Sequence, residues 1–164
     1  MEATPDARLE QLLEDLQAHF RQGGTLGDLQ GFEDKDYEAI YAVGHGLYMQ
    51  GKNEEAAKVF GFLMMHNPYD RRFPIAMGAA QQMLGKFADA IGFYALGIVL
   101  DMNDPVPLFH TAECLAASGE RDDAREAFER VIMLCNKPGH QALREKASVR
   151  LQLLRATEPA QETK

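Results

Sequence analysis

Apolar residues recur along this chain at helical intervals, beginning close to its first residue. Between Pro5 and Arg21 they repeat every three or four positions, which is the spacing of one face of an α-helix. The members of this stripe are Leu9, Leu12, Leu13, Leu16 and Phe20. The remaining positions are mostly polar, and their four carboxylates make the outer face acidic. The pattern predicts an amphipathic helix that ends at Gly23-Gly24.

The middle of the chain repeats with a period of 34 residues. One column of this period is glycine, a second is alanine and a third is aromatic. The three columns are Gly51, Gly85 and Gly119, then Ala56, Ala90 and Ala124, then Phe60, Tyr94 and Phe128. This period and pattern are typical of the tetratricopeptide repeat, a helix-turn-helix unit that stacks into a solenoid. Residues 37–136 are therefore expected to hold three repeats, at approximately 37–70, 71–104 and 105–138.

Two of the repeated positions have a direct physical reason. A small residue at the eighth position, as in Gly44 and Gly78, lets the two helices of a unit approach closely. Glycine at the fifteenth position closes the turn between them in a left-handed conformation. The expected helices are 37–50 with 53–66, 71–84 with 87–100, and 105–118 with 121–134.

The remaining segments flank this solenoid. Residues 1–36 form an N-terminal unit of helix and linker, in which Asp34 or Asp36 is suited to cap the next helix. Residues 139–157 are predicted to form a helix that caps the open end of the stack, and residues 158–164 are predicted to be a disordered polar tail. The fold class is therefore all-α.

Charge and composition limit the classes of partner that this chain is expected to bind. The chain has 164 residues and a formal net charge of −8, which argues against nucleic acid or anionic lipid as a direct partner. Neither a signal peptide nor an apolar run long enough for a membrane span is seen, so the cytosol is the expected compartment. Cys114 and Cys135 lack metal-site or redox spacing and are read as buried thiols.

No catalytic constellation emerges from the sequence. The five histidines fall on different predicted elements, and no metalloprotease, nucleophile-elbow or phosphate-loop motif is present. We therefore expect a protein that is not an enzyme and that needs neither a metal nor a cofactor.

The first helix of each repeat is expected to line a concave groove. In such a stack its second, fifth, ninth, twelfth and thirteenth positions point inward. The candidate peptide-binding residues at these positions are Tyr41, His45, Tyr48, Met49, Ile75, Ala79, Met83 and Phe109. This apolar path suits an extended hydrophobic peptide, and only Arg72 could clamp an acidic tail. The alternative is that the N-terminal segment or a dimer partner covers these side chains.

Three motifs, in their order along the chain, give this sequence a resemblance to the class II chaperones of bacterial type III secretion systems, the low-calcium-response protein H group. They are GGTLGDLQGF after the first helix, NPYDRRF between the first two repeats and FHTAECL in the third. The resemblance implies a bacterial cytoplasmic chaperone that keeps two hydrophobic, pore-forming translocator proteins soluble and apart before export. It also places Tyr41, Tyr48 and Tyr94 among the groove aromatics, with His45 where the family often has phenylalanine. The period itself assigns Tyr94 to packing, so its role stays open.

The same resemblance implies a homodimer formed through the N-terminal helix, for which the stripe from Leu9 to Phe20 is a sequence-level reason. Docking of that helix onto its own first repeat is the alternative. Two other functions also stay open. One is a general tetratricopeptide scaffold for another protein's peptide segment. The other is a chaperone that is also a co-regulator, acting through a transcriptional activator without touching DNA.

Overall fold

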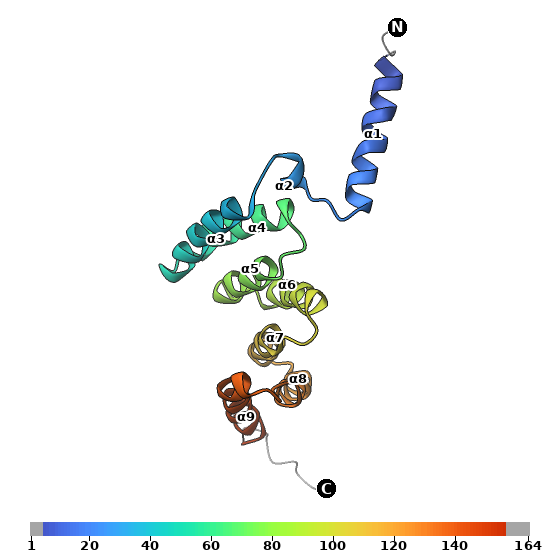
Figure 1. The fold of residues 1–164 in the computed structure, drawn as a ribbon. Coiled ribbons are helices and arrows are strands. Elements are labelled where there is room, and N and C mark those ends of the chain that lie inside the picture. Colours follow the sequence, from blue (N-terminus) through green and yellow to red (C-terminus); the bar gives the residue numbers. More distant parts are fainter. Residues whose placement is uncertain (1–4, 157–164) are drawn as a thin grey trace.

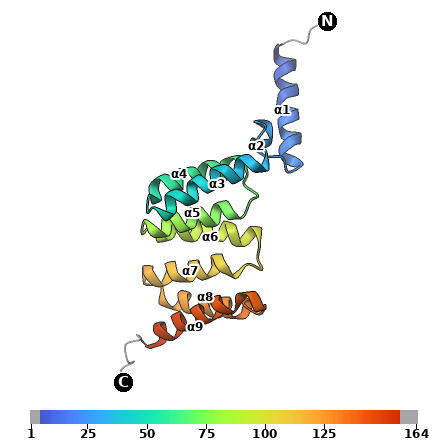
Figure 2. The same cartoon turned by 60° about the vertical axis from the view of Figure 1, so that its left-hand side comes forward.

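The computed structural model describes residues 5–156, and the regular secondary structure of these residues is helical (Figure 1). Three antiparallel helix pairs form its centre. They are α3 (Asp34–Met49) with α4 (Asn53–His66), α5 (Arg72–Met83) with α6 (Phe87–Leu100), and α7 (Pro105–Ser118) with α8 (Arg121–Leu134). The pairs stack one on the next, as Figure 2 shows from a second side. The all-α tetratricopeptide solenoid is confirmed, while the tail expected at 158–164 lies outside the described residues.

Glycine at the eighth repeat position explains how closely each pair packs. A Cβ atom added to Gly44 would lie 2.7 Å from the ring of Phe60, and one added to Gly78 would lie 2.8 Å from the ring of Tyr94. The aromatic residue of the second helix therefore rests directly on the backbone of the first. Both rings are almost completely buried. The turn glycines Gly51, Gly85 and Gly119 have φ angles of +75°, +72° and +87°, as their place after the first helices predicts.

The linker is more ordered than the sequence suggested. It contains the short helix α2 (Leu26–Leu29), which begins with reciprocal hydrogen bonds between Thr25 and Asp28. Behind it, the buried His66 ring lies 2.7 Å from the Phe62 carbonyl oxygen and 3.1 Å from the Gln30 side-chain oxygen. The first contact lies within α4 and fixes the ring, and the second joins the linker to α4.

The start of α3 also differs in detail from the expectation. Glu33 is the N-cap residue, and its backbone N–H donates to the Asp36 carboxylate at 2.9 Å. Asp36 therefore stabilises the first turn of α3 from the third helical position instead of capping it. Carboxylates are favoured at either place because the helix N-terminus carries partial positive charge.

The N-terminal helix α1 (Pro5–Arg21) projects away from the stack (Figures 1 and 2). Among the described helices it packs against no other. Its anchor is the linker, where His19 Nε2 lies 2.9 Å from the Thr25 carbonyl oxygen. Leu9, Leu12, Leu13 and Phe20 are between 48% and 56% exposed, and Leu16 is partly buried. The apolar stripe of α1 is therefore not docked on the first repeat in this structure.

The other end of the stack is closed by α9 (Gln141–Ala156), which follows a 3-10 turn, Pro138–His140. Ala147 and Leu151 are the buried residues of α9, and they join the core around Phe128 and Val131. The predicted capping helix is therefore present. Within residues 5–156, no helix combines the length and apolar character needed to cross a bilayer.

Candidate functional site

The first helices of the pairs lie together along one side of the stack. Direct contacts join α3 to α5, α5 to α7 and α7 to α9, so that α9 continues the row (Figure 1). A hollow of about 160 Å³ opens between α3 and α5. We call it the Tyr41 hollow. Its lining residues are Tyr41, His45, Tyr48, Phe60, Ile75, Ala76 and Ala79.

The Tyr41 hollow unites five of the predicted peptide-binding residues, which are Tyr41, His45, Tyr48, Ile75 and Ala79. Aromatic contacts fix its wall. The Tyr41 ring stacks on His45 with 6.4 Å between centroids and lies 5.8 Å from Phe60. Burial raises the pKa of the Tyr41 phenol, so the hydroxyl is neutral at neutral pH. The wall therefore offers apolar area with an uncharged hydroxyl group.

Arg72 lies beside this hollow, but its charge is already compensated. The guanidinium is 2.6 Å from a carboxylate oxygen of Glu38 and 2.6 Å from one of Asp70. It also sits over the Tyr41 ring, 5.3 Å from the centroid. A carboxylate ligand would have to displace two existing ion pairs to bind here. Arg72 thus stabilises the wall and is poorly placed to clamp an acidic tail.

The other four predicted residues lie outside the Tyr41 hollow. Met49 and Met83, at the ends of α3 and α5, are 70% and 61% exposed. Tyr94 and Phe109 are buried. The Tyr94 hydroxyl donates a hydrogen bond of 2.7 Å to the Gln82 side-chain oxygen. Tyr94 therefore supports the concave face from behind, whereas the buried Phe109 lines a separate hollow between α7 and α9.

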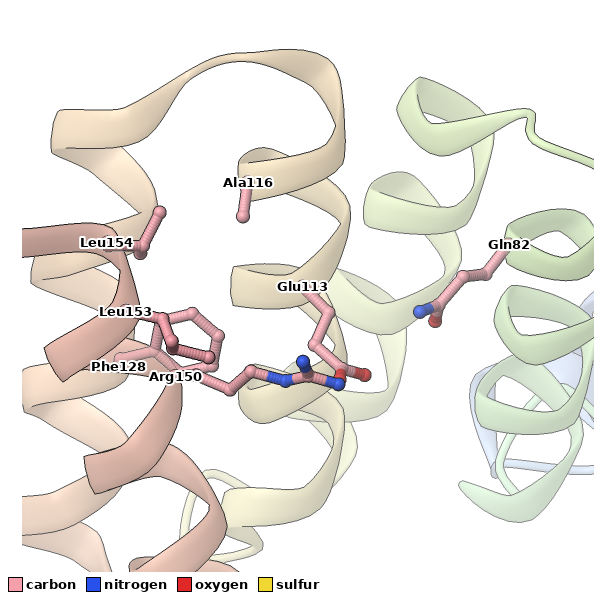
Figure 3. A pocket seen from close by; sticks show the side chains of 7 residues that line it. All are labelled: Gln82, Glu113, Ala116, Phe128, Arg150, Leu153 and Leu154. Carbon is pink, nitrogen blue, oxygen red and sulfur yellow. The ribbon is translucent and has the colours of Figure 1, made fainter. Parts of the chain in front are cut away.

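A second hollow, of about 380 Å³, lies at the C-terminal end of the same side, and we call it the α9 hollow. Figure 3 shows its lining residues: Gln82, Glu113, Ala116, Phe128, Arg150, Leu153 and Leu154. Gln82, Glu113 and Ala116 occupy concave positions of the repeats. The three α9 residues were missed because α9 was interpreted only as a cap. The run Leu151-Gln152-Leu153-Leu154 was the available signal, since a cap with one solvent face needs fewer leucines.

Glu113 is the centre of a polar network in the α9 hollow. Its carboxylate lies 3.1 Å from His110 Nδ1 and accepts a hydrogen bond of 3.2 Å from Arg150. The hydrogen bond with His110 is the main cause that holds the pKa of Glu113 below its ordinary value, with smaller contributions from Arg150 and Gln82. Partial burial opposes this effect. The network therefore favours the ionised carboxylate in the folded protein.

This network predicts a pH-dependent contribution to stability. A lowered folded-state pKa means that the contribution is fully present above the unfolded value, near 4.5, and is lost as pH falls through the folded value. We expect Glu113→Gln to reduce the difference in urea midpoint between neutral pH and roughly pH 3, relative to the unmodified chain. The control is Glu54→Gln on the exposed first turn of α4. An undiminished difference in Glu113→Gln would contradict this assignment.

Within residues 5–156, no group of three or more His, Cys, Asp or Glu side chains is arranged to hold an ion. Cys114 and Cys135 are buried thiols, and burial raises the pKa of Cys114 to about 11. Burial also raises the pKa of Cys135, so both thiols favour the protonated form.

The stack of helix pairs defines a tetratricopeptide-repeat protein whose concave side carries an aromatic hollow. The family model for the tetratricopeptide repeat matches residues 37–70 and 76–104. The third pair, α7 and α8, has the same architecture although it lies beyond the matched residues.

The chain belongs to the low-calcium-response protein H family, the class II translocator chaperones of type III secretion systems. It is 31% identical over 141 residues to the low calcium response locus protein H of Yersinia pseudotuberculosis, covering 85% of this chain and 84% of the relative. The translocator chaperone SycD of Yersinia enterocolitica superposes with a TM-score of 0.76 at 34% identity, over 79% of this chain and 98% of SycD. A further SycD crystal structure is described as an alternative dimer.

Structures of PcrH from Pseudomonas aeruginosa are also similar, and two PcrH structures contain a bound segment. The complex with the chaperone-binding region of PopD has a TM-score of 0.74 at 35% identity, covering 77% of this chain and 96% of PcrH. The complex with the chaperone-binding region of PopB has a TM-score of 0.70 at 35% identity, covering 73% and 97%.

Proposed function

We propose that this chain is a bacterial cytoplasmic chaperone that holds extended apolar segments of pore-forming translocators before their export. The observation that carries the proposal is the Tyr41 hollow, which joins aromatic and aliphatic side chains of two repeats. Arg72, the cationic residue that could have bound an acidic tail, already forms ion pairs with Glu38 and Asp70. Such a surface favours an apolar anchor over a charged tail.

The physical need follows from what a translocator does. A protein that inserts into a host membrane exposes apolar segments before export, and these aggregate or enter the wrong bilayer. A groove that covers the segments removes this hazard, while the net charge of −8 keeps the complex dispersed. An extended segment loses conformational entropy on binding, so we expect dissociation constants on the order of micromolar for an isolated segment.

The same groove is proposed to serve two translocators in turn. PcrH has been crystallised with segments of both PopD and PopB. The experiment is co-expression of this chain with each translocator of its own secretion system, followed by measurement of the soluble translocator fraction. A translocator that stays equally insoluble with and without the chain would refute the proposal for that client.

We further propose that the α1 stripe forms a homodimer interface, because it is apolar, exposed and undocked in the single chain. Leu12→Glu/Leu16→Glu should weaken dimerisation by at least about a hundredfold, since each buried leucine contributes roughly 1.5–3 kcal/mol. Sedimentation equilibrium measures this change. The thermal unfolding of the repeats should not change, because α1 packs on none of them.

The matched control is Gln11→Glu/Ala18→Glu, which adds the same charge to exposed positions on the opposite face of α1. It should leave the dimer intact. Two results would count against the interface: a dimer that survives the leucine replacements, or a loss of repeat stability, which would indicate that α1 docks on its own chain.

A further inference from the structure

Arg72 is the only charged side chain of α5, and it joins α5 to α3. It occupies the second position of the second repeat, and Glu38 occupies the same position of the first. The Arg72 Nη2 atom lies 2.6 Å from a carboxylate oxygen of Glu38 and 2.6 Å from one of Asp70. The third repeat has Val106 at this position, which is uncharged. An ion pair between second positions is therefore available only to the first two repeats.

The two carboxylates hold Arg72 in different ways. Asp70 lies in the turn before α5 and accepts hydrogen bonds from Arg72 Nε at 3.0 Å, from Nη2 at 2.6 Å and from the backbone N–H at 3.0 Å. Its side chain is 19% exposed, so this pair is partly shielded from solvent. The side chains of Glu38 and Arg72 are 58% and 43% exposed. Dissolved salt therefore screens the pair with Glu38 more strongly, while Asp70 keeps Arg72 fixed to its own turn.

The Glu38–Arg72 ion pair, which we call the α3–α5 brace, lies next to the Tyr41 hollow on both helices. Tyr41 follows Glu38 by three residues on α3, and Ala76 follows Arg72 by four residues on α5. Residues at these spacings are neighbours on one helical face. Tyr41 and Ala76 belong to the α3 and α5 walls of the hollow. The brace therefore ties the two walls together about one helical turn from the hollow.

The separation of α3 and α5 depends strongly on side chains that bridge them. α3 packs chiefly on α4, and α5 packs chiefly on α4 and α6, whereas the direct contact between α3 and α5 is small. Arg72 bridges them by its aromatic contacts as well as by its charge. Its guanidinium carbon lies 5.3 Å from the ring centroid of Tyr41 and 5.7 Å from that of Phe73. The guanidinium thus also covers the Tyr41 ring and restricts its movement.

We propose that Arg72 is a positioning residue, which sets the width of the Tyr41 hollow by tying α3 to α5 through Glu38. The proposal rests on the proposed function and adds to it a residue outside the hollow that controls the hollow's width. Binding of an uncharged apolar segment should consequently weaken as the salt concentration rises, because salt screens the brace. An uncharged segment forms no ion pair with the chaperone, so this salt dependence can arise only within the chaperone.

The test measures the affinity of one uncharged peptide at two salt concentrations. The probe is a short peptide of serine and glutamine with a single central leucine, blocked at both ends. Methyl NMR titration of the full chain follows Ile75 and Ala79, which line the hollow. The Debye length falls from roughly 10 Å in about 0.1 M sodium chloride to roughly 3 Å in about 1 M. The dissociation constant should rise about two- to fivefold, which is the range expected for an exposed ion pair.

Two variants remove the brace without changing a residue that lines the hollow. Arg72→Met and Glu38→Gln should each weaken binding in low salt by about two- to fivefold and should abolish the salt dependence. The double variant should lose no more than either single variant, because all three lack the same interaction. Arg72→Lys should retain part of the salt dependence, since lysine keeps the charge but cannot form the fork with Asp70. A purely structural role would weaken binding and leave its salt dependence unchanged.

Arg71→Met is the matched control. Arg71 directly precedes Arg72, but its guanidinium pairs with Asp101 and Asp104 between α6 and α7. It does not line the Tyr41 hollow, and the variant should keep the full salt dependence. Thermal melting should show that each variant is folded. If Arg72→Met does not fold, Glu38→Gln decides the test, because Glu38 is exposed and Arg72 keeps its pair with Asp70.

Three results would count against the proposal. An affinity that is constant or increases with salt would leave the proposed function intact and exclude the brace as the determinant of the hollow's width. Salt dependence that persists unchanged in Glu38→Gln would lead to the same conclusion. A peptide that shifts neither the Ile75 nor the Ala79 methyl groups at either salt concentration would count against the proposed function as well.

Discussion

Tyr41→Ala/Tyr48→Ala is expected to weaken client binding by at least about a hundredfold, because a central aromatic anchor contributes roughly 2 kcal/mol or more. Both side chains line the Tyr41 hollow from α3, seven residues apart and so on the same face. Truncating both removes the aromatic wall against which we propose that the client side chain packs. In co-expression, the soluble fraction of the translocator should fall to the level seen without chaperone.

Two controls separate binding from folding in this experiment. Tyr41→Phe/Tyr48→Phe keeps the rings and should retain most of the affinity. Tyr69→Ala removes a tyrosine that is 55% exposed in the turn between the first two repeats, outside both hollows. It should have no effect. Because Tyr41 also contacts Phe60 and Phe73, urea unfolding of the double variant is needed beside the binding data. A folded double variant that still solubilises its client would exclude the Tyr41 hollow as the capture site.

The repeat helices could be located from sequence because their determinants are local and recur. Glycine closes each turn at the same place, and the residues facing Phe60 and Tyr94 across each pair are glycines. Each repeat helix consequently begins and ends within three residues of its expected bounds. The lining residues of the Tyr41 hollow could be predicted for a related reason, because the helical period determines which positions of a known repeat point inward.

Features that depend on contacts between distant segments were harder to predict. The linker helix α2 carries a local signal in Thr25 and Asp28, but its docking depends on His66 and Gln30, which are 36 residues apart. The α9 hollow depends on how the capping helix crosses α7, and no periodicity fixes that crossing. Tyr94 shows a third limit. Its place in the 34-residue period predicted a packing role, whereas the family resemblance implied a role in the groove. In the structure the buried Tyr94 contacts the concave side through its hydrogen bond with Gln82.

Tyr94→Ala is expected to cost roughly 3–5 kcal/mol of unfolding free energy, the usual range for truncating a fully buried aromatic residue. Tyr94 is 0% exposed, rests on the Gly78 backbone and stacks on His110 with 5.5 Å between centroids. The gap left by alanine is enclosed by α5 and α7, so little of it can collapse. Urea denaturation at neutral pH measures the loss.

Tyr94→Phe is the matched control, because it keeps the ring and removes only the hydroxyl that holds Gln82. It should cost about 1 kcal/mol, the usual net value of one hydrogen bond. If Tyr94 acts on the groove through Gln82, Tyr94→Phe should also weaken client binding. A small stability loss in Tyr94→Ala, comparable to that of Tyr94→Phe, would show that the ring is not the packing centre that its burial implies.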